Sequence, residues 1–294
     1  MRPVFVIALG LVALAGVSAA QARIIVGAKA TTEQRLLAAM TAQYLDAHGY
    51  DVRTRAGMGA TVLRRAPLKN QVDLYWADVG TSLTVHTEVE GAAALSPEAA
   101  YNKVKALDAE KGLVWLAPTD AHRTVVLAMR AADAEDMGIA TLSDLVAART
   151  RNGGFTLGVT SAWAGRPDGL VGFQARYDIR WPRGELRRMQ TDRVAKALKA
   201  GAIDVGVVSA TDGRIAAFDL RVLRDDRNAV PKTAIAPVIR RDVLDAHPGL
   251  RKHLNAIGET LNDKTMRRLT TQVNVENKAT EHVAETYLKE QGLM

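Results

Sequence analysis

The chain alternates short apolar segments with amphipathic ones, and this alternation limits the folds it can adopt. Residues 22–29 form a continuous apolar run, residues 31–45 carry apolar side chains at helical spacing, and residues 50–55 have the pattern of a second strand. A loop and a short helix then lead to a third apolar strand at 72–76. Strands that alternate with helices in this way favour βαβ units and a parallel sheet.

The same alternation continues to the end of the chain. Further strands are predicted at 112–116, 123–129, 155–159, 202–208 and 220–223, and further helices at 97–111, from Thr141, from Pro167, at 192–200 and from 241 onward. The TTEQ stretch at 31–34 matches a capping box, so Gln34 is predicted to be a cap partner at the start of its helix. Ligands of open α/β sheets bind beyond the carboxyl ends of strands. The loops at 27–33, 77–82, 158–168 and 209–213 are therefore the expected binding loops.

The first 22 residues have the pattern of a secretory signal peptide. Arg2 precedes an apolar stretch at 5–17, and the small-residue sequence SAAQA at 18–22 follows it. The apolar stretch is shorter than a membrane-spanning helix needs to be. We therefore expect a soluble, exported protein of roughly 270 residues that begins near Arg23.

Composition excludes several classes of protein. Without cysteine there is no disulfide framework, so a large hydrophobic core has to stabilise the fold. The formal net charge of +7 is spread along the chain, and its densest basic cluster, at 183–188, has no aromatic residues among its charges, which argues against nucleic-acid binding. The six histidines are scattered and no nucleophile, zinc or phosphate-loop motif occurs. The sequence predicts no catalytic set, no metal site and no cofactor.

Several segments taken together resemble one protein family. They are GAKATTEQRLLAAM, DLYWADVGTSL, GLVWLAP, RPDGL, IDVGVVSATDGRIAAFDLRVLRDD, APVIRRDVLDAHPGL and the tail ETYLKEQGL. In this order they are similar to the periplasmic substrate-binding proteins of ABC importers for glycine betaine, choline and carnitine. The resemblance covers nearly the whole chain after the signal peptide.

The resemblance implies the α/β type II binding-protein fold, with two lobes around a ligand cleft. Lobe I is then expected at 23–126 plus 232–294 and lobe II at 127–231, with crossings near Val125-Val126 and near Pro231-Lys232. It also implies that the protein binds a small solute, closes its lobes and delivers the solute to a membrane permease, as a monomer and without catalysis.

The family holds a quaternary ammonium group by cation–π contacts with several aromatic rings. Aligned by eye, those four positions correspond here to Asp78, Val125, Ser209 and the stretch 231–234, which contains Thr233. None of these residues is aromatic. Trp163, in the loop after the strand at 155–159, is the best remaining aromatic candidate for the cleft.

The groups that hold the ligand carboxylate in this family are better preserved. Lys29, Thr81 and Arg166 match them, and a guanidinium can bind a carboxylate through two parallel hydrogen bonds. Asp78 and Arg123 are additions to the family pattern. Asp78 either accepts hydrogen bonds from a ligand or pairs with Arg123, and in both cases the aromatic box is lost.

These residues suggest an altered pocket that binds a small polar zwitterion or an acid. A second hypothesis keeps the quaternary ammonium ligand and uses Trp163 together with other aromatic residues. The alternatives from other classes are an enzyme built on the same two lobes and a sensor subunit that docks to a membrane receptor.

Overall fold

The structure is a computed structural model that describes residues 23–83, 89, 95–122, 125–230 and 233–294. The expected signal peptide, Arg123 and the expected crossing at Pro231-Lys232 lie outside these described residues. No helix within them combines the length and the apolar character needed to cross a membrane.

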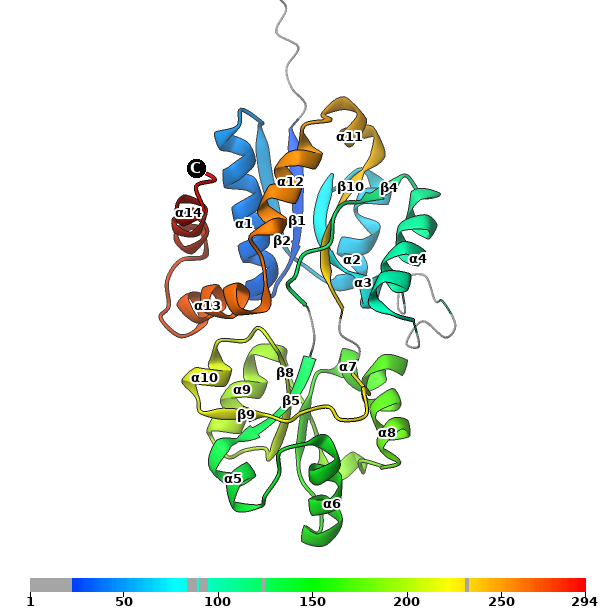
Figure 1. Cartoon of the computed structure of the whole chain (residues 1–294), viewed down its shortest axis with the longest axis vertical. Coiled ribbons are helices and arrows are strands. Elements are labelled where there is room, and N and C mark those ends of the chain that lie inside the picture. Colours follow the sequence, from blue (N-terminus) through cyan, green and yellow to red (C-terminus); the bar gives the residue numbers. More distant parts are fainter. Residues whose placement is uncertain (1–22, 84–88, 90–94, 123–124, 231–232) are drawn as a thin grey trace, which may run out of the picture.

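The described part of the chain forms two five-stranded sheets, one in each of two lobes (Figure 1). The sheet of lobe I contains β1 (Ile24–Lys29), β2 (Val52–Met58), β3 (Leu74–Asp78), β4 (Leu113–Trp115) and β10 (Ile235–Arg240). The sheet of lobe II contains β5 (Val125–Arg130), β6 (Leu157–Val159), β7 (Leu186–Arg188), β8 (Val205–Ser209) and β9 (Leu220–Val222). The expectation of two α/β lobes is thus confirmed.

The two sheets share one topology. In lobe I the order is β2-β1-β3-β10-β4, with β1 parallel to β2 and β3, and β10 antiparallel to β3. In lobe II the order is β7-β6-β8-β5-β9, with β6 parallel to β7 and β8, and β5 antiparallel to β8. The antiparallel strand of each sheet is the one that the chain enters after leaving the other lobe. Val125 and Val126 already pair with β8 in the second sheet.

Helices cover both faces of each sheet (Figure 1). Lobe I has α1 (Thr32–Ala47), α2 (Ala60–Arg65), η1 (Pro67–Lys69), α3 (Val79–Thr81), α4 (Pro97–Ala109), α11 (Arg241–Ala246), α12 (Leu250–Glu259), α13 (Asp263–Asn274) and α14 (Thr280–Glu290). Lobe II has α5 (Ala131–Asp136), α6 (Leu142–Asn152), α7 (Ser161–Gly165), η4 (Pro167–Val171), α8 (Gly172–Tyr177), η5 (Arg183–Glu185), α9 (Thr191–Lys199) and α10 (Arg214–Ala217). In lobe I, α1, α12 and α14 pack on one face, and α2 and α4 pack on the other.

The two helix caps predicted from sequence had different outcomes. Thr141 caps α6, and its hydroxyl accepts from the backbone N–H of Asp144, as predicted. The predicted capping box at the start of α1 is wrong, because the side chain of Thr31 accepts no capping hydrogen bond there. The first turn of α1, at the cleft end of lobe I, is therefore left with uncapped backbone N–H groups.

Candidate functional site: the cleft between the lobes

The expected binding loops lie between the two lobes. Lys29 and Asp78 end β1 and β3 of lobe I, whereas Arg166 follows β6 and Ser209 ends β8 in lobe II. Parallel strands place their carboxyl ends at one edge of a sheet, and these edges of the two sheets face each other (Figure 1). The fold therefore brings together side chains that are up to 180 residues apart in sequence.

Lobe I carries a small pocket at this edge. Lys29, Asp78 and Thr81 line it, together with Arg64 and Tyr75 from the lobe interior. Its cavity volume is about 10 Å³, which is room for about one water molecule. The pocket therefore has to widen to hold a solute.

Asp78 caps the short helix α3. The side chain is 6% exposed, and its Oδ1 accepts from the backbone N–H of Thr81 at 2.6 Å. One carboxylate oxygen is therefore committed to holding the Gly80-Thr81 turn. Its expected alternative partner, Arg123, lies outside the described residues.

Arg166 reaches from lobe II to lobe I. Its Nε and Nη2 donate to the two carboxylate oxygens of Asp168, and its Nη1 donates to the Thr81 hydroxyl at 3.3 Å. Burial lowers the pKa of Arg166, but hydrogen bonding to Asp168 and the charge of Asp78 outweigh it, so that the pKa is raised overall. Asp168 thus occupies the side of the guanidinium formed by Nε and Nη2. Nη1 extends to lobe I, where it meets Thr81 at the rim of the lobe I pocket.

The remaining candidates occupy different surroundings. Ser209 lies at the lobe II edge, and its hydroxyl is 2.8 Å from that of Thr211. Thr233 packs against the Gly80 turn so closely that a Cβ at Gly80 would lie 2.1 Å from its Cγ2. Trp163 is 5% exposed and its ring belongs to the hydrophobic core of lobe II. Ser209 and Thr233 are thus near the cleft, whereas the ring of Trp163 is not a cleft wall.

None of the aromatic residues of the chain forms a box in the cleft. All of them except Phe5 lie within the described residues, and each belongs to a hydrophobic core of one lobe. Tyr75 alone among them lines the lobe I pocket, and its hydroxyl accepts from Arg64 at 3.1 Å. The ring surface that a methylated ammonium group needs is thus missing from the described part of the cleft.

The side chain of Gln34 does not have the capping role that the sequence predicted for it. It is 2% exposed, and its Nε2 has no hydrogen-bond partner among the described residues. The hydroxyl of Thr31, in the same turn, also lacks a described partner. A buried amide without a partner is costly, so the first turn of α1 holds two polar groups that the described part of the fold leaves unused. The sequence did not indicate these unpaired groups, because the TTEQ pattern matches a capping box and the capping box does not form.

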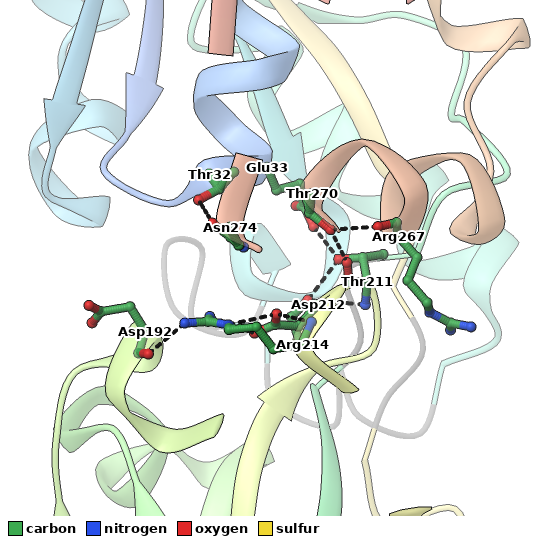
Figure 2. Close-up of polar contacts among 10 residues, drawn as sticks. Thr32, Glu33, Asp192, Thr211, Asp212, Arg214, Arg267, Thr270 and Asn274 are labelled. Carbon is green, nitrogen blue, oxygen red and sulfur yellow. Dashed lines mark hydrogen bonds and ion pairs between the residues drawn. The ribbon is translucent and has the colours of Figure 1, made fainter. Parts of the chain in front are cut away.

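A polar contact between the lobes lies on the other side of the cleft (Figure 2). The Thr211 hydroxyl of lobe II donates to Glu33 Oε2 on α1 at 2.7 Å, and both residues are buried. The Thr270 hydroxyl on α13 donates to the backbone oxygen of Thr211 at 2.5 Å, and Arg267 donates to the backbone oxygen of Ala210. We call these five residues the interlobe contact. Because its partners come from different lobes, it forms only when the lobes are close together.

Replacing Thr211 with valine is expected to weaken the binding of every ligand by the same factor, about tenfold. The substitution keeps the side-chain shape but leaves the Glu33 carboxylate buried with one partner fewer, which disfavours closure. Calorimetric titration with two ligands would measure the factor. Thr150→Val is the matched control, because the Thr150 hydroxyl bonds only within its own helix at Val146. A change in the ratio of the two affinities would contradict a pure effect on closure.

A buried ion pair supports the floor of the lobe I pocket. Arg64 binds both oxygens of Asp108, and Asp108 also accepts from Trp115 Nε1 at 2.7 Å. Arg64 donates to Tyr75 as well, so all four side chains form one network. Hydrogen bonding to Asp108 helps to raise the pKa of Arg64 in spite of the opposing effect of burial. The guanidinium beside the pocket is therefore charged and held in place.

Comparisons with known proteins agree with this architecture. The family model for the substrate-binding domain of ABC-type glycine betaine transport systems matches residues 22–290. A glycine-betaine-binding protein of Pseudomonas aeruginosa is 38% identical over 275 residues, which cover 92% of this chain and 88% of that protein. The glycine betaine-binding protein YehZ of Escherichia coli is 32% identical and covers 91% of this chain and 90% of its own.

Two solved structures show the same fold. A glycine betaine/carnitine/choline ABC transporter protein superposes with a TM-score of 0.77 at 26% identity, over 92% of this chain and 99% of that one. The apo structure of YehZ has a TM-score of 0.71 at 30% identity, over 93% of this chain and the whole of the other. The chain therefore belongs to the family of substrate-binding proteins of ABC-type glycine betaine transport systems, and it has their two-lobe fold.

Proposed function

We propose that this protein is the periplasmic binding component of an ABC uptake transporter, and that its pocket takes a small polar zwitterion or carboxylate instead of a quaternary ammonium compound. It works as a monomer, performs no catalysis and passes its solute to a membrane permease. Family membership supports the transport role. The placement of the aromatic residues supports the change of ligand.

The absence of ring surface is the observation that carries the proposal. A trimethylammonium group has no N–H to donate, so it depends on cation–π contact with ring faces close to its charge. Every Phe, Tyr and Trp ring between residues 23 and 294 packs in or against a core, and the positions expected to face the ligand hold Asp78, Ser209 and Thr233. Such a pocket suits a ligand whose cationic group can donate hydrogen bonds.

Two cationic residues that match the family, Arg166 and Lys29, support an acidic group at the other end of the ligand. Nη1 of Arg166 donates to the Thr81 hydroxyl, and Thr81 and Lys29 line the lobe I pocket. A carboxylate bound there would exchange water for charge-assisted hydrogen bonds, each contributing about 1.5–3 kcal/mol. These residues therefore favour a ligand with an acidic group.

The names of the relatives favour a second candidate, a binder of glycine betaine itself. The two relatives above that are more than 30% identical to this chain are named for that ligand. A binder of this kind would have to turn core aromatic side chains toward the cleft or hold the methyl groups without rings. Both candidates keep the transport role.

A ligand panel separates the two candidates. We expect glycine, β-alanine and guanidinoacetate to raise the melting temperature more than glycine betaine, choline or carnitine, because only the first group offers N–H donors. A ligand at 100 times its dissociation constant adds about 2.7 kcal/mol to the free energy of unfolding, which a thermal-shift assay detects. Calorimetric titration then gives affinities, and micromolar binding of glycine betaine would refute the altered pocket.

A further inference from the structure

Three of the four tryptophans of this chain have the hydrogen bond that a buried indole needs. Trp76 donates to the Thr41 hydroxyl at 2.9 Å, Trp115 to Asp108 at 2.7 Å, and Trp181 to the backbone oxygen of Phe155 at 2.8 Å. Trp163 is equally buried, but its Nε1 has no partner among the described residues. A buried indole N–H normally finds a partner, so this exception needs an explanation.

The position of Trp163 links this free donor to the candidate site. Trp163 lies on α7, three residues before Arg166, and its backbone oxygen accepts from the Arg166 N–H at 3.4 Å. Gly169 approaches the same oxygen so closely that a Cβ there would lie 2.1 Å away. The backbone of Trp163 is therefore fixed to the loop that carries the Arg166 guanidinium.

Packing also decides which part of Trp163 is available. The ring lies in the lobe II core, tilted against Phe173 with a centroid distance of 6.4 Å. The ring is thus buried among apolar neighbours, and the N–H is its one polar group. A cation cannot use this ring, whereas a hydrogen-bond acceptor can use its edge.

We propose that the indole N–H of Trp163 donates a hydrogen bond to the acidic group of the ligand, beside Arg166. This inference rests on the proposed function, because it requires a ligand with an acceptor at that end. Trp163 then selects for oxygen acceptors and does not form an aromatic wall. The indole N–H, which has no partner among the described residues, gains one when the ligand binds.

Spectroscopy of the indole groups tests this directly on the full chain. Protein with ¹⁵N-labelled indoles is titrated to saturation with glycine and, separately, with glycine betaine, two probes that share one carboxylate. We expect the Trp163 resonance, assigned through Trp163→Phe, to show the largest shift of the four, while those of Trp76 and Trp115 stay in place. A Trp163 resonance that does not move with a saturating probe would overturn the inference.

Replacing the N–H without changing the ring shape gives a second test. We would place the tryptophan isostere 3-benzothienylalanine, which has sulfur in place of N–H, at position 163 and, as a matched control, at position 181. At 163 we expect an unchanged or higher melting temperature without ligand and about tenfold weaker probe binding. At 181 we expect a melting temperature lower by several degrees and unchanged binding, because the oxygen of Phe155 loses its donor.

The two tests separate this inference from the proposed function. The ligand-free comparison needs no ligand, so equal destabilisation at 163 and 181 would show that Trp163 has a structural partner and would overturn the inference. Tight binding of glycine betaine would instead refute the altered pocket, while a shift of the Trp163 resonance with the same probe would still support the hydrogen bond.

Discussion

Arg166→Ala is expected to weaken the binding of small carboxylates about 100-fold or more. The substitution removes the guanidinium that reaches Thr81 at the lobe I pocket, and each charge-assisted hydrogen bond that it would donate to a carboxylate contributes about 1.5–3 kcal/mol. It also removes the cation that binds both oxygens of the buried Asp168, so that the negative charge of Asp168 would disfavour a ligand carboxylate nearby. Calorimetric titration with the best ligand of the panel measures the loss.

Two further variants sharpen the interpretation of this result. Arg166→Lys keeps the charge but not the planar fork, so an intermediate loss is expected. Arg149→Ala is the matched control, because Arg149 also binds a carboxylate of lobe II, that of Glu185, through Nε and Nη2. If Arg166→Ala binds carboxylates as the wild type does, or if Arg149→Ala loses as much affinity, the assignment of Arg166 to the ligand is wrong.

Asp108→Ala is expected to lower the free energy of unfolding by about 3–5 kcal/mol. Asp108 is completely buried, and its removal leaves the Arg64 cation without its counter-ion in the interior of lobe I. For a domain of this size the melting temperature should fall by about 10 °C. Thermal unfolding followed by circular dichroism measures both quantities.

The double variant Arg64→Met with Asp108→Leu separates the cost of an unpaired charge from the loss of packing. Replacing a buried ion pair with apolar residues of similar size is often neutral, so most of the stability should return. Glu285→Ala serves as the control, since the Glu285–Lys289 pair is exposed and should not change the melting temperature measurably. A double variant as unstable as Asp108→Ala would show that the network stabilises the lobe by more than charge neutralisation.

The regular elements of this protein were largely predictable because their signals are local. The apolar run at 22–29 became β1 and the helical spacing after Thr31 became α1. Strand β10 (Ile235–Arg240) had no such signal. It contains Pro237, which argues against an inner strand, yet it pairs with both β3 and β4. β10 lies between β3 and β4 because the chain re-enters the lobe I sheet there when it returns from lobe II.

The binding edges of the two sheets were also predictable, whereas the partners of their side chains were not. The rule that ligands bind beyond the carboxyl ends of strands selected the loops that carry Lys29, Asp78, Arg166 and Ser209. Asp78 was expected to bind a ligand or Arg123, and the structure adds that one of its oxygens accepts from the Thr81 N–H. Ligand contacts of the other candidates remain predictions.

The sequence by itself determined most of the strands and helices and the absence of aromatic residues at the expected ligand positions, because periodicity and residue identity act over a few neighbouring residues, while the resemblance to a known family implied the two lobes. Only the tertiary structure decided that Gln34 is not a cap partner, that the ring of Trp163 is buried while its N–H is free among the described residues, and that Thr211 bonds Glu33 across the cleft. The physical reason is that a hydrogen bond depends on which donors and acceptors the fold brings within about 3 Å, and in the interlobe contact these are 178 residues apart.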